Sequence, residues 1–162
     1  MNGETALITG STSGIGLHLA NEFAAHRHGL VLVAPVESEL QAQAEEFRRR
    51  FGIAVHVLAR DLRKPEAAQE IFDTLARESV NIDILLNNAG FAYRGKFWGI
   101  PIEQDVEVLR LNIEAVVRLT KLFLPEMIDR GHGRILNVAS VAAFEPGPHL
   151  AIYHATKASF SR

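Results

Sequence analysis

The chain has 162 residues, of which 48% are hydrophobic and 22% are charged, and these proportions are typical of one globular domain. Its formal net charge of −2 gives no electrostatic basis for binding nucleic acid or an anionic membrane surface. The absence of cysteine excludes disulfides, thiolate catalysis and cysteine-ligated zinc, and without a secretory signal or a membrane-spanning apolar run we predict a cytoplasmic protein.

The first predicted unit is a short apolar strand, residues 6–8, that leads into the glycine-rich stretch Thr9-Gly10-Ser11-Thr12-Ser13-Gly14-Ile15-Gly16. Apolar residues at helical spacing follow, and they predict a helix from Gly14 to His28 that Gly29 ends as a C-cap. A glycine turn before a helix presents free backbone N–H groups, and the helix dipole favours an anion there. The stretch therefore predicts a phosphate site, although glycine spacing alone also fits a tight turn without a ligand.

Two helices further along the chain have specific boundary signals. Ser38 and Gln41 have the spacing of a capping box, which predicts a helix through Phe51 that Gly52 ends. Pro65 suits the first turn of the next helix. The inner face of that helix is predicted to consist of Ala68, Ile71, Phe72 and Leu75.

The remaining elements complete an alternation of strands and helices. Strands are predicted at 30–33, 54–58, 82–86 and 135–138, and helices from Pro101 to Arg130 and again near Tyr153. Near-continuous apolar strands separated by helices are typical of a parallel sheet covered on both faces. Right-handed crossovers then make this a doubly wound α/β fold, for which we expect the strand order 3-2-1-4-5.

Residues that can carry chemistry follow several of these strands. They are Asp61-Leu62, the segment Asn87-Asn88-Ala89-Gly90, Ser140, and Tyr153 with Lys157. On a helix, Tyr153 and Lys157 share one face, and a lysine charge there favours the phenolate, which suits a general acid or base. Taken singly, the Tyr-Lys pair also fits a solvated helix face, and the two asparagines also fit turn chemistry.

In these motifs the chain resembles the N-terminal two-thirds of a short-chain dehydrogenase/reductase. The cofactor loop Thr-Gly-x-x-x-Gly-x-Gly of that family stands at 9–16, and its Asn-Asn-Ala-Gly segment stands at 87–90. Its catalytic serine matches Ser140, and its Tyr-x-x-x-Lys pair matches Tyr153 and Lys157. A family asparagine in the long helix before the fifth strand matches Asn112.

The resemblance implies catalytic roles for Asn112, Ser140, Tyr153 and Lys157. Tyr153 would exchange a proton with the substrate oxygen, and Ser140 would donate a hydrogen bond to the same oxygen. Lys157 would hold the nicotinamide ribose, and Asn112 would help to place Lys157 and a water-borne proton path. Without the resemblance, Asn112 also fits a polar helix residue that bonds locally.

The resemblance also implies an NAD(P) cofactor, with Asp61 near the adenine. The expected cofactor-binding residues are Gly10, Ser11, Ser13, Gly14, Ile15, Gly16, Asp61, Leu62, Asn88, Ala89, Gly90, Tyr153 and Lys157. NAD-preferring relatives usually carry an acid after the second strand, whereas NADP-preferring relatives often carry arginine there or before the second loop glycine. These positions hold Pro35 and Ser13 here. Pro148 and the segment 151–158 resemble relatives that mostly use NADP, so we favour NADP slightly.

Two further features of the chain have less specific meanings. The seven histidines include His26 and His28 near a helix end, but no carboxylate cluster accompanies them, so we predict no metal site. An aromatic patch follows the fourth strand and would either wall a substrate pocket or cover the end of the sheet. The patch consists of Phe91, Tyr93, Phe97 and Trp98.

The predicted function is hydride transfer between NAD(P) and a small carbonyl or alcohol compound whose identity the sequence does not specify. Family members are longer, so residues 1–162 are expected to be an NAD(P)-binding Rossmann-like domain that is truncated in the helix carrying Tyr153 and Lys157. The fifth strand would then be an open apolar edge. A dinucleotide-binding module or fragment without turnover is the alternative, and a full-length form is expected to be a homo-oligomer.

Overall fold

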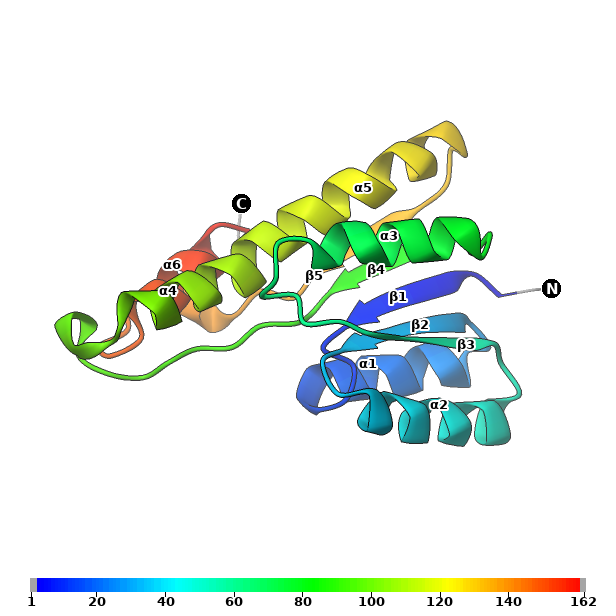
Figure 1. Cartoon of the computed structure of the whole chain (residues 1–162), viewed down its shortest axis with the longest axis horizontal. Coiled ribbons are helices and arrows are strands. Elements are labelled where there is room, and N and C mark those ends of the chain that lie inside the picture. Colours follow the sequence, from blue (N-terminus) through cyan, green and yellow to red (C-terminus); the bar gives the residue numbers. More distant parts are fainter. Residues whose placement is uncertain (1–2, 161–162) are drawn as a thin grey trace.

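The computed structural model describes residues 3–160, and its centre is a five-stranded parallel sheet in the order β3-β2-β1-β4-β5 (Figure 1). The strands are β1 (Thr5–Thr9), β2 (Gly29–Ala34), β3 (Val55–Ala59), β4 (Ile84–Asn87) and β5 (Arg134–Asn137). The helices are α1 (Gly14–Ala25), α2 (Glu37–Phe51), α3 (Ala67–Arg77), α4 (Ile102–Leu109), α5 (Ala115–Asp129) and α6 (Ala151–Ala158). The predicted doubly wound α/β fold and its strand order are confirmed.

The sheet is buried on both faces because its strands are apolar at nearly every position. On β1, Ala6 and Ile8 point into the core that α1 and α2 cover, whereas Leu7 points into the core on the opposite face. Helices α3 and α5 cover that opposite face (Figure 1). Two separate cores therefore fix the sheet between helical layers and leave its carboxyl end open to carry a site.

The end of the first helix differs from the prediction. Helix α1 ends at Ala25, and Gly29 begins β2 instead of capping the helix. The turn is made by Arg27, which has a left-handed φ of 66° and donates its backbone N–H to Ala24. The Arg27 guanidinium also donates to the carbonyl of Phe51, so a contact distant in sequence helps to hold a conformation usually left to glycine.

The predicted capping box at the start of α2 is wrong. The helix begins at Glu37, which places Ser38 inside the first turn, and its N-cap is Val36 without a side-chain hydrogen bond. Acidic residues in the first turn interact favourably with the helix dipole instead. The other end is as predicted, since Gly52 has a left-handed φ of 64° and its N–H donates to Arg48.

The helix predicted from Pro101 to Arg130 contains a wider turn that the sequence pattern does not reveal. A π-helical turn, Arg110–Glu114, separates α4 from α5 and carries the buried Asn112 near its middle. Such turns are rare inside α-helices and are frequent at functional sites.

The junction between β1 and β4 holds the open end of the sheet together. The Thr9 hydroxyl donates to the Leu86 carbonyl (3.3 Å) and accepts the backbone N–H groups of Asn88 and Ala89 (3.0 Å each). The Asn88 side-chain amide donates to the carbonyls of Thr9 (2.8 Å) and Gly10 (3.2 Å). The glycine loop and the segment after β4 are thereby joined in one hydrogen-bonded unit.

Replacement of Thr9 by valine tests this junction, because Thr9→Val keeps the shape of the side chain and removes its hydroxyl. The N–H groups of Asn88 and Ala89 then lose their acceptor, and we expect the free energy of unfolding to fall by about 1–3 kcal/mol. Thr5→Val, at the half-buried start of the same strand, is the control and should change it by less than about 0.5 kcal/mol. Urea unfolding measures both, and equal effects of the two variants would contradict the assignment.

Candidate active site

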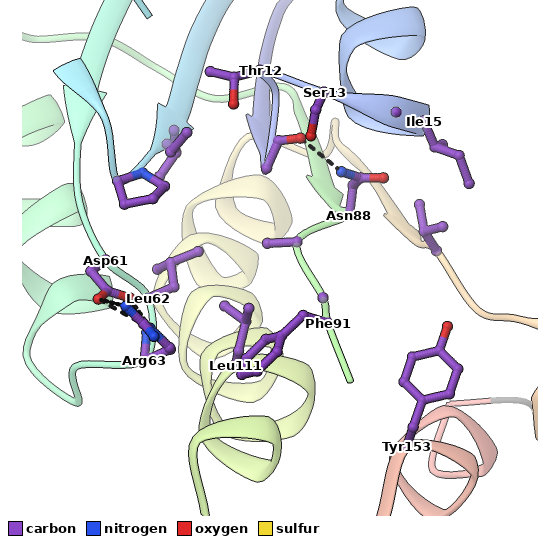
Figure 2. A pocket seen from close by; sticks show the side chains of 18 of the residues that line it. Thr12, Ser13, Ile15, Asp61, Leu62, Arg63, Asn88, Phe91, Leu111 and Tyr153 are labelled. Atoms are coloured by element: carbon purple, nitrogen blue, oxygen red, sulfur yellow. Dashed lines mark hydrogen bonds and ion pairs between the residues drawn. The ribbon is translucent and has the colours of Figure 1, made fainter. Parts of the chain in front are cut away.

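A cavity of about 730 Å³ opens at the carboxyl end of the sheet (Figure 2). Segments that follow all five strands contribute to it, as expected for a doubly wound sheet. It is lined by Gly10, Thr12, Ser13, Gly14, Ile15, Val33, Ala34, Pro35, Arg60, Asp61, Leu62, Arg63, Asn88, Ala89, Gly90, Phe91, Tyr93, Leu111, Val138, Ala139, Ser140, Tyr153 and Lys157.

Most of the predicted site residues line this cavity, but Ser11, Gly16 and Asn112 do not. Ser11 is fully buried, and its carbonyl accepts a hydrogen bond from the side chain of Gln43 (2.8 Å). These three residues therefore support the walls of the site, while the other predicted residues face its interior.

The glycine loop has the shape of an anion cradle. Gly10 and Gly14 have left-handed φ values of 65° and 51°, and a Cβ added to Gly14 would meet no atom within 4 Å. A Cβ on Gly16, in contrast, would lie 2.0 Å from the carbonyl oxygen of Gly10. Ser13, the N-cap of α1, makes no side-chain capping bond, so N–H groups of the first helical turn remain for an outside acceptor. These features fit a phosphate group.

The part of the cavity next to α6 and the segment after β5 is formed by Ser140, Tyr153 and Lys157. Figure 2 shows the Tyr153 hydroxyl directed into the cavity, and the Nζ of Lys157 lies 5.8 Å from the centre of the Tyr153 ring. Lys157 donates to the carbonyl of Val138 (2.9 Å), and burial lowers the pKa of its ammonium below the ordinary value. The Ser140 hydroxyl accepts the N–H of Ala142 (3.2 Å) and keeps its own proton for another acceptor.

Asn112 joins the loop after β4 to α6. Its side-chain oxygen accepts the N–H of Phe91 (3.1 Å), and its amide donates to the carbonyl of Phe91 and to the hydroxyl of Thr156 (3.0 Å each). Thr156 in turn donates to the carbonyl of Tyr153 (2.7 Å). The amide therefore positions the helix that carries Tyr153. Thr156 was not predicted as a site residue, and it is fully buried although it lies inside the Tyr-x-x-x-Lys motif.

Gly90 lies next to both Asn112 and Lys157. A Cβ at Gly90 would lie 3.2 Å from the Asn112 side-chain oxygen and 3.4 Å from the Lys157 Nζ. The absence of a side chain at Gly90 therefore lets the amide and the ammonium approach the same segment.

An ion pair that was not predicted from the sequence lies in the part of the cavity formed by the segment after β3. Asp61 faces the cavity as expected, but its carboxylate is bound by the guanidinium of Arg63 (Figure 2). Hydrogen bonds from Arg63 hold the pKa of the Asp61 carboxyl below its ordinary value, so this group is ionised at neutral pH. The sequence feature that could have indicated this ion pair is the position of Arg63 two residues after Asp61, in the loop that follows β3.

The aromatic patch divides between the cavity and the surface. Phe91 and Tyr93 line the cavity with ring centres 5.2 Å apart, whereas Phe97 and Trp98 are 59% and 83% exposed. The Tyr93 hydroxyl donates to Glu107 (2.9 Å), which favours the protonated phenol and raises the pKa of Tyr93. Tyr93 is therefore less suited than Tyr153 to exchange a proton.

The histidines singled out from the sequence bond to the backbone. The ring of His26 pairs with the carbonyl of Glu22 (2.9 Å), and the ring of His28 pairs with that of Glu4 (3.3 Å). Within residues 3–160, no group of three or more His, Cys, Asp or Glu side chains is placed to hold a metal ion.

The comparisons with known proteins agree on one family. The profile described as short chain dehydrogenase matches residues 4–162. The human very-long-chain 3-oxoacyl-CoA reductase is 35% identical over 96% of this chain and 50% of its own length. A short-chain dehydrogenase from Sphingobium yanoikuyae, solved in complex with NADPH, is 41% identical with a TM-score of 0.90 over 96% of this chain and 60% of its own.

A second solved structure, L-sorbose reductase from Gluconobacter frateurii complexed with NADPH and L-sorbose, is 35% identical. Its TM-score is 0.92, and the match covers 98% of this chain and 60% of that protein. The chain thus spans 50% to 60% of the length of these relatives.

Removal of the Asn112 side chain tests its positioning role. Asn112→Ala leaves the backbone of Phe91 and the hydroxyl of Thr156 without their partners, and we expect faster amide hydrogen exchange in 151–158. Glu114→Ala, in the same π-helical turn, removes a surface ion pair with Arg118 and is the control. Unchanged exchange in 151–158 of the Asn112 variant would show that this helix does not depend on the amide.

Proposed function

The chain belongs to the short-chain dehydrogenase family, and on that basis we propose that it is the cofactor-binding and proton-transferring part of an NAD(P)-dependent oxidoreductase. The observation that carries the proposal is that one cavity joins the glycine loop to Ser140, Tyr153 and Lys157. An anion cradle and a proton-exchanging group in the same cavity suit a reaction between a phosphate-bearing cofactor and a small molecule. The relatives are named reductases and dehydrogenases, so a binding module without turnover is not favoured.

NADP is the favoured dinucleotide. The pyrophosphate would bind at the first turn of α1, where Gly14 leaves open space and the helix dipole favours negative charge. Pro35 and Ser13 carry no carboxylate that would oppose a 2′-phosphate, and two of the related structures contain NADPH. Asn88, Ala89 and the other loop residues that line the cavity would contact the rest of the dinucleotide. When bound, the nicotinamide supplies or accepts the hydride.

The side chains of Ser140 and Tyr153 would interact with the substrate oxygen. Tyr153 exchanges a proton with that oxygen, and Ser140 donates a hydrogen bond to it. Lys157 places a cationic group within 6 Å of the Tyr153 ring and, with its remaining N–H groups, holds a ribose hydroxyl. Asn112 acts through Phe91 and Thr156 as a positioning residue. The substrate class is a small carbonyl or alcohol compound.

We further infer that residues 1–162 form an NAD(P)-binding domain of a longer homo-oligomeric enzyme. The relatives are longer, and the edge strand β5 exposes Leu136, which suits pairing with additional chain. Exposed Val117, Leu124 and Ile128 on α5 suit an apolar contact between subunits. Among the described residues, no helix is long and apolar enough to cross a membrane, and a cytoplasmic location remains a prediction.

Binding is tested by titrating the chain with NADPH, NADH and ATP and following nicotinamide fluorescence or heat. Gly14→Asp places a carboxylate in the cradle and should raise the Kd for NADPH at least about tenfold, because like charges repel there. Gly131→Asp is a matched control, since Gly131 also has a left-handed φ (64°) and open space but lies outside the cavity. Tighter binding of ATP than of NADPH, or an unchanged Kd in the Gly14 variant, would contradict the proposal.

Turnover is tested in an enzyme that contains this chain. Tyr153→Phe should lower kcat by about 10² to 10⁴ with little change in the Kd for NADPH, because it deletes only the exchangeable proton. Tyr93→Phe is the comparison within the same cavity, and its loss should stay below about tenfold because its hydroxyl serves Glu107. Lys157→Ala should lower kcat and also raise the Kd for NADPH. A loss below tenfold for Tyr153→Phe would reject its assigned role.

A further inference from the structure

Gln43 is a polar residue at a core position of α2. The helix turns residues 40, 43, 44 and 47 inward, and Leu40, Ala44 and Phe47 belong to the core on that face of the sheet. Gln43 is buried with them, since only 8% of its surface is exposed. An apolar residue is expected at such a position. A buried polar side chain that breaks the pattern therefore calls for a partner or a function.

The side chain of Gln43 contacts the backbone of the glycine loop. Its Nε2 donates to the carbonyl oxygen of Ser11 (2.8 Å). The other polar atom of the amide, Oε1, is buried and has no hydrogen-bond partner among residues 3–160, and the same is true of the Ser11 hydroxyl. One hydrogen bond therefore joins two residues that each keep a buried polar atom without a partner.

Stability alone does not account for this arrangement. A buried polar atom without a partner costs more free energy than an ordinary hydrogen bond contributes. An apolar side chain at position 43 would leave the Ser11 carbonyl unpaired, but it would also remove the unpaired Oε1 from the core. The amide is better explained by its effect on the conformation of the glycine loop.

The contact orients one peptide unit of the loop. In a trans peptide the C=O and the following N–H point in opposite directions, and the described residues contain no cis peptide bond. Because the Ser11 carbonyl faces Gln43, the N–H of Thr12 points away from α2. Thr12 lines the cavity, whereas Ser11 and Gln43 do not. The Thr12 N–H has no acceptor within residues 3–160, so it is free to donate to a ligand oxygen.

The neighbouring backbone groups of the loop are held by other elements. The N–H groups of Gly10 and Ser11 lie 2.8 Å and 3.4 Å from the carbonyl oxygen of Val33 on β2, and the Gly10 carbonyl accepts from Asn88. Within the described part of the chain, the bond from Gln43 is the hydrogen bond that α2 makes to this loop. The orientation of the peptide between residues 11 and 12 therefore depends on Gln43.

We propose that Gln43 is a positioning residue for cofactor binding, because its amide holds the Ser11 carbonyl toward α2 and so presents the Thr12 N–H to the dinucleotide. The inference rests on the proposed function, which makes a dinucleotide the occupant of the cavity. Gln43 does not line the cavity, so it acts through the loop and not by contact with the ligand.

Gln43→Met tests this role, because it replaces the amide by an unbranched side chain of similar length that cannot donate. Titration of the chain with NADP⁺ at about pH 8.5 should give a Kd at least about fivefold above that of the parent chain, the effect of one ordinary hydrogen bond. Gln41→Met is the matched control. It makes the same substitution at an exposed position of the same helix and should leave the Kd within about twofold of the parent value.

Gln43→Glu separates loop positioning from a general effect on packing. It keeps the shape of the side chain, but the introduced carboxyl donates to the Ser11 carbonyl only while it is protonated, and burial raises the pKa of that carboxyl. Relative to the parent chain at the same pH, its Kd should be raised at least about fivefold at about pH 8.5 and at most about twofold at about pH 5.5. The ratio for Gln43→Met should be equal at both pH values, because its side chain does not titrate.

Three results would decide against the proposal. A rise in Kd of less than about fivefold for Gln43→Met would overturn the inference and leave the proposed function intact. Equal ratios for Gln43→Glu and Gln43→Met at both pH values would do the same, because the amide would then act only through packing. Failure of NADP⁺ to bind the parent chain at millimolar concentration would overturn the inference together with the proposed function.

Discussion

The hydrogen bonds between Thr9 and the segment that begins at Asn88 are the constraint on which the open end of this sheet depends. They join the end of β1 to the chain leaving β4, and the Asn88 amide also fixes the carbonyl of Gly10. Gly16 then packs against Gly10 at a distance that no side chain would permit. The position of the anion cradle is therefore determined by packing and hydrogen bonding within the fold, before any ligand is present.

A second connection carries this constraint to the reacting end. Asn112 bonds to Phe91, just past the segment that Thr9 holds, and through Thr156 it reaches the backbone of Tyr153. The cradle and the tyrosine therefore belong to one hydrogen-bonded framework, although they lie far apart in the sequence. Arg63 is held at the opposite end by carboxylates from two segments, Asp61 and Glu107. Rigid support at both ends suits a site that must bind an extended molecule in one orientation.

Those features of the fold that depend on local patterns could be predicted from the sequence. The apolar strands, the glycine loop and the Tyr153–Lys157 spacing each have a short-range signature, and the strand order follows from crossover handedness. The features that were missed depend on partners distant in sequence or on a choice among similar local states. Arg27 replaces glycine in a left-handed turn and also bonds Phe51, α2 begins before Ser38, and the π-helical turn has no periodic signal. The Asp61–Arg63 pair is local, but only the structure reveals that the side chains turn toward each other.

The arrangement of the site suits one dinucleotide that occupies the cavity from the end of β3 to α6. Hydrogen–deuterium exchange of the chain with and without saturating NADPH measures this directly, because bound ligand slows exchange where it contacts or orders the backbone. We expect slower exchange in 10–16, 60–63, 88–91 and 151–158 together, with little change at the distant end of α5 near Asp129. Protection confined to the glycine loop, or greatest outside these segments, would contradict it.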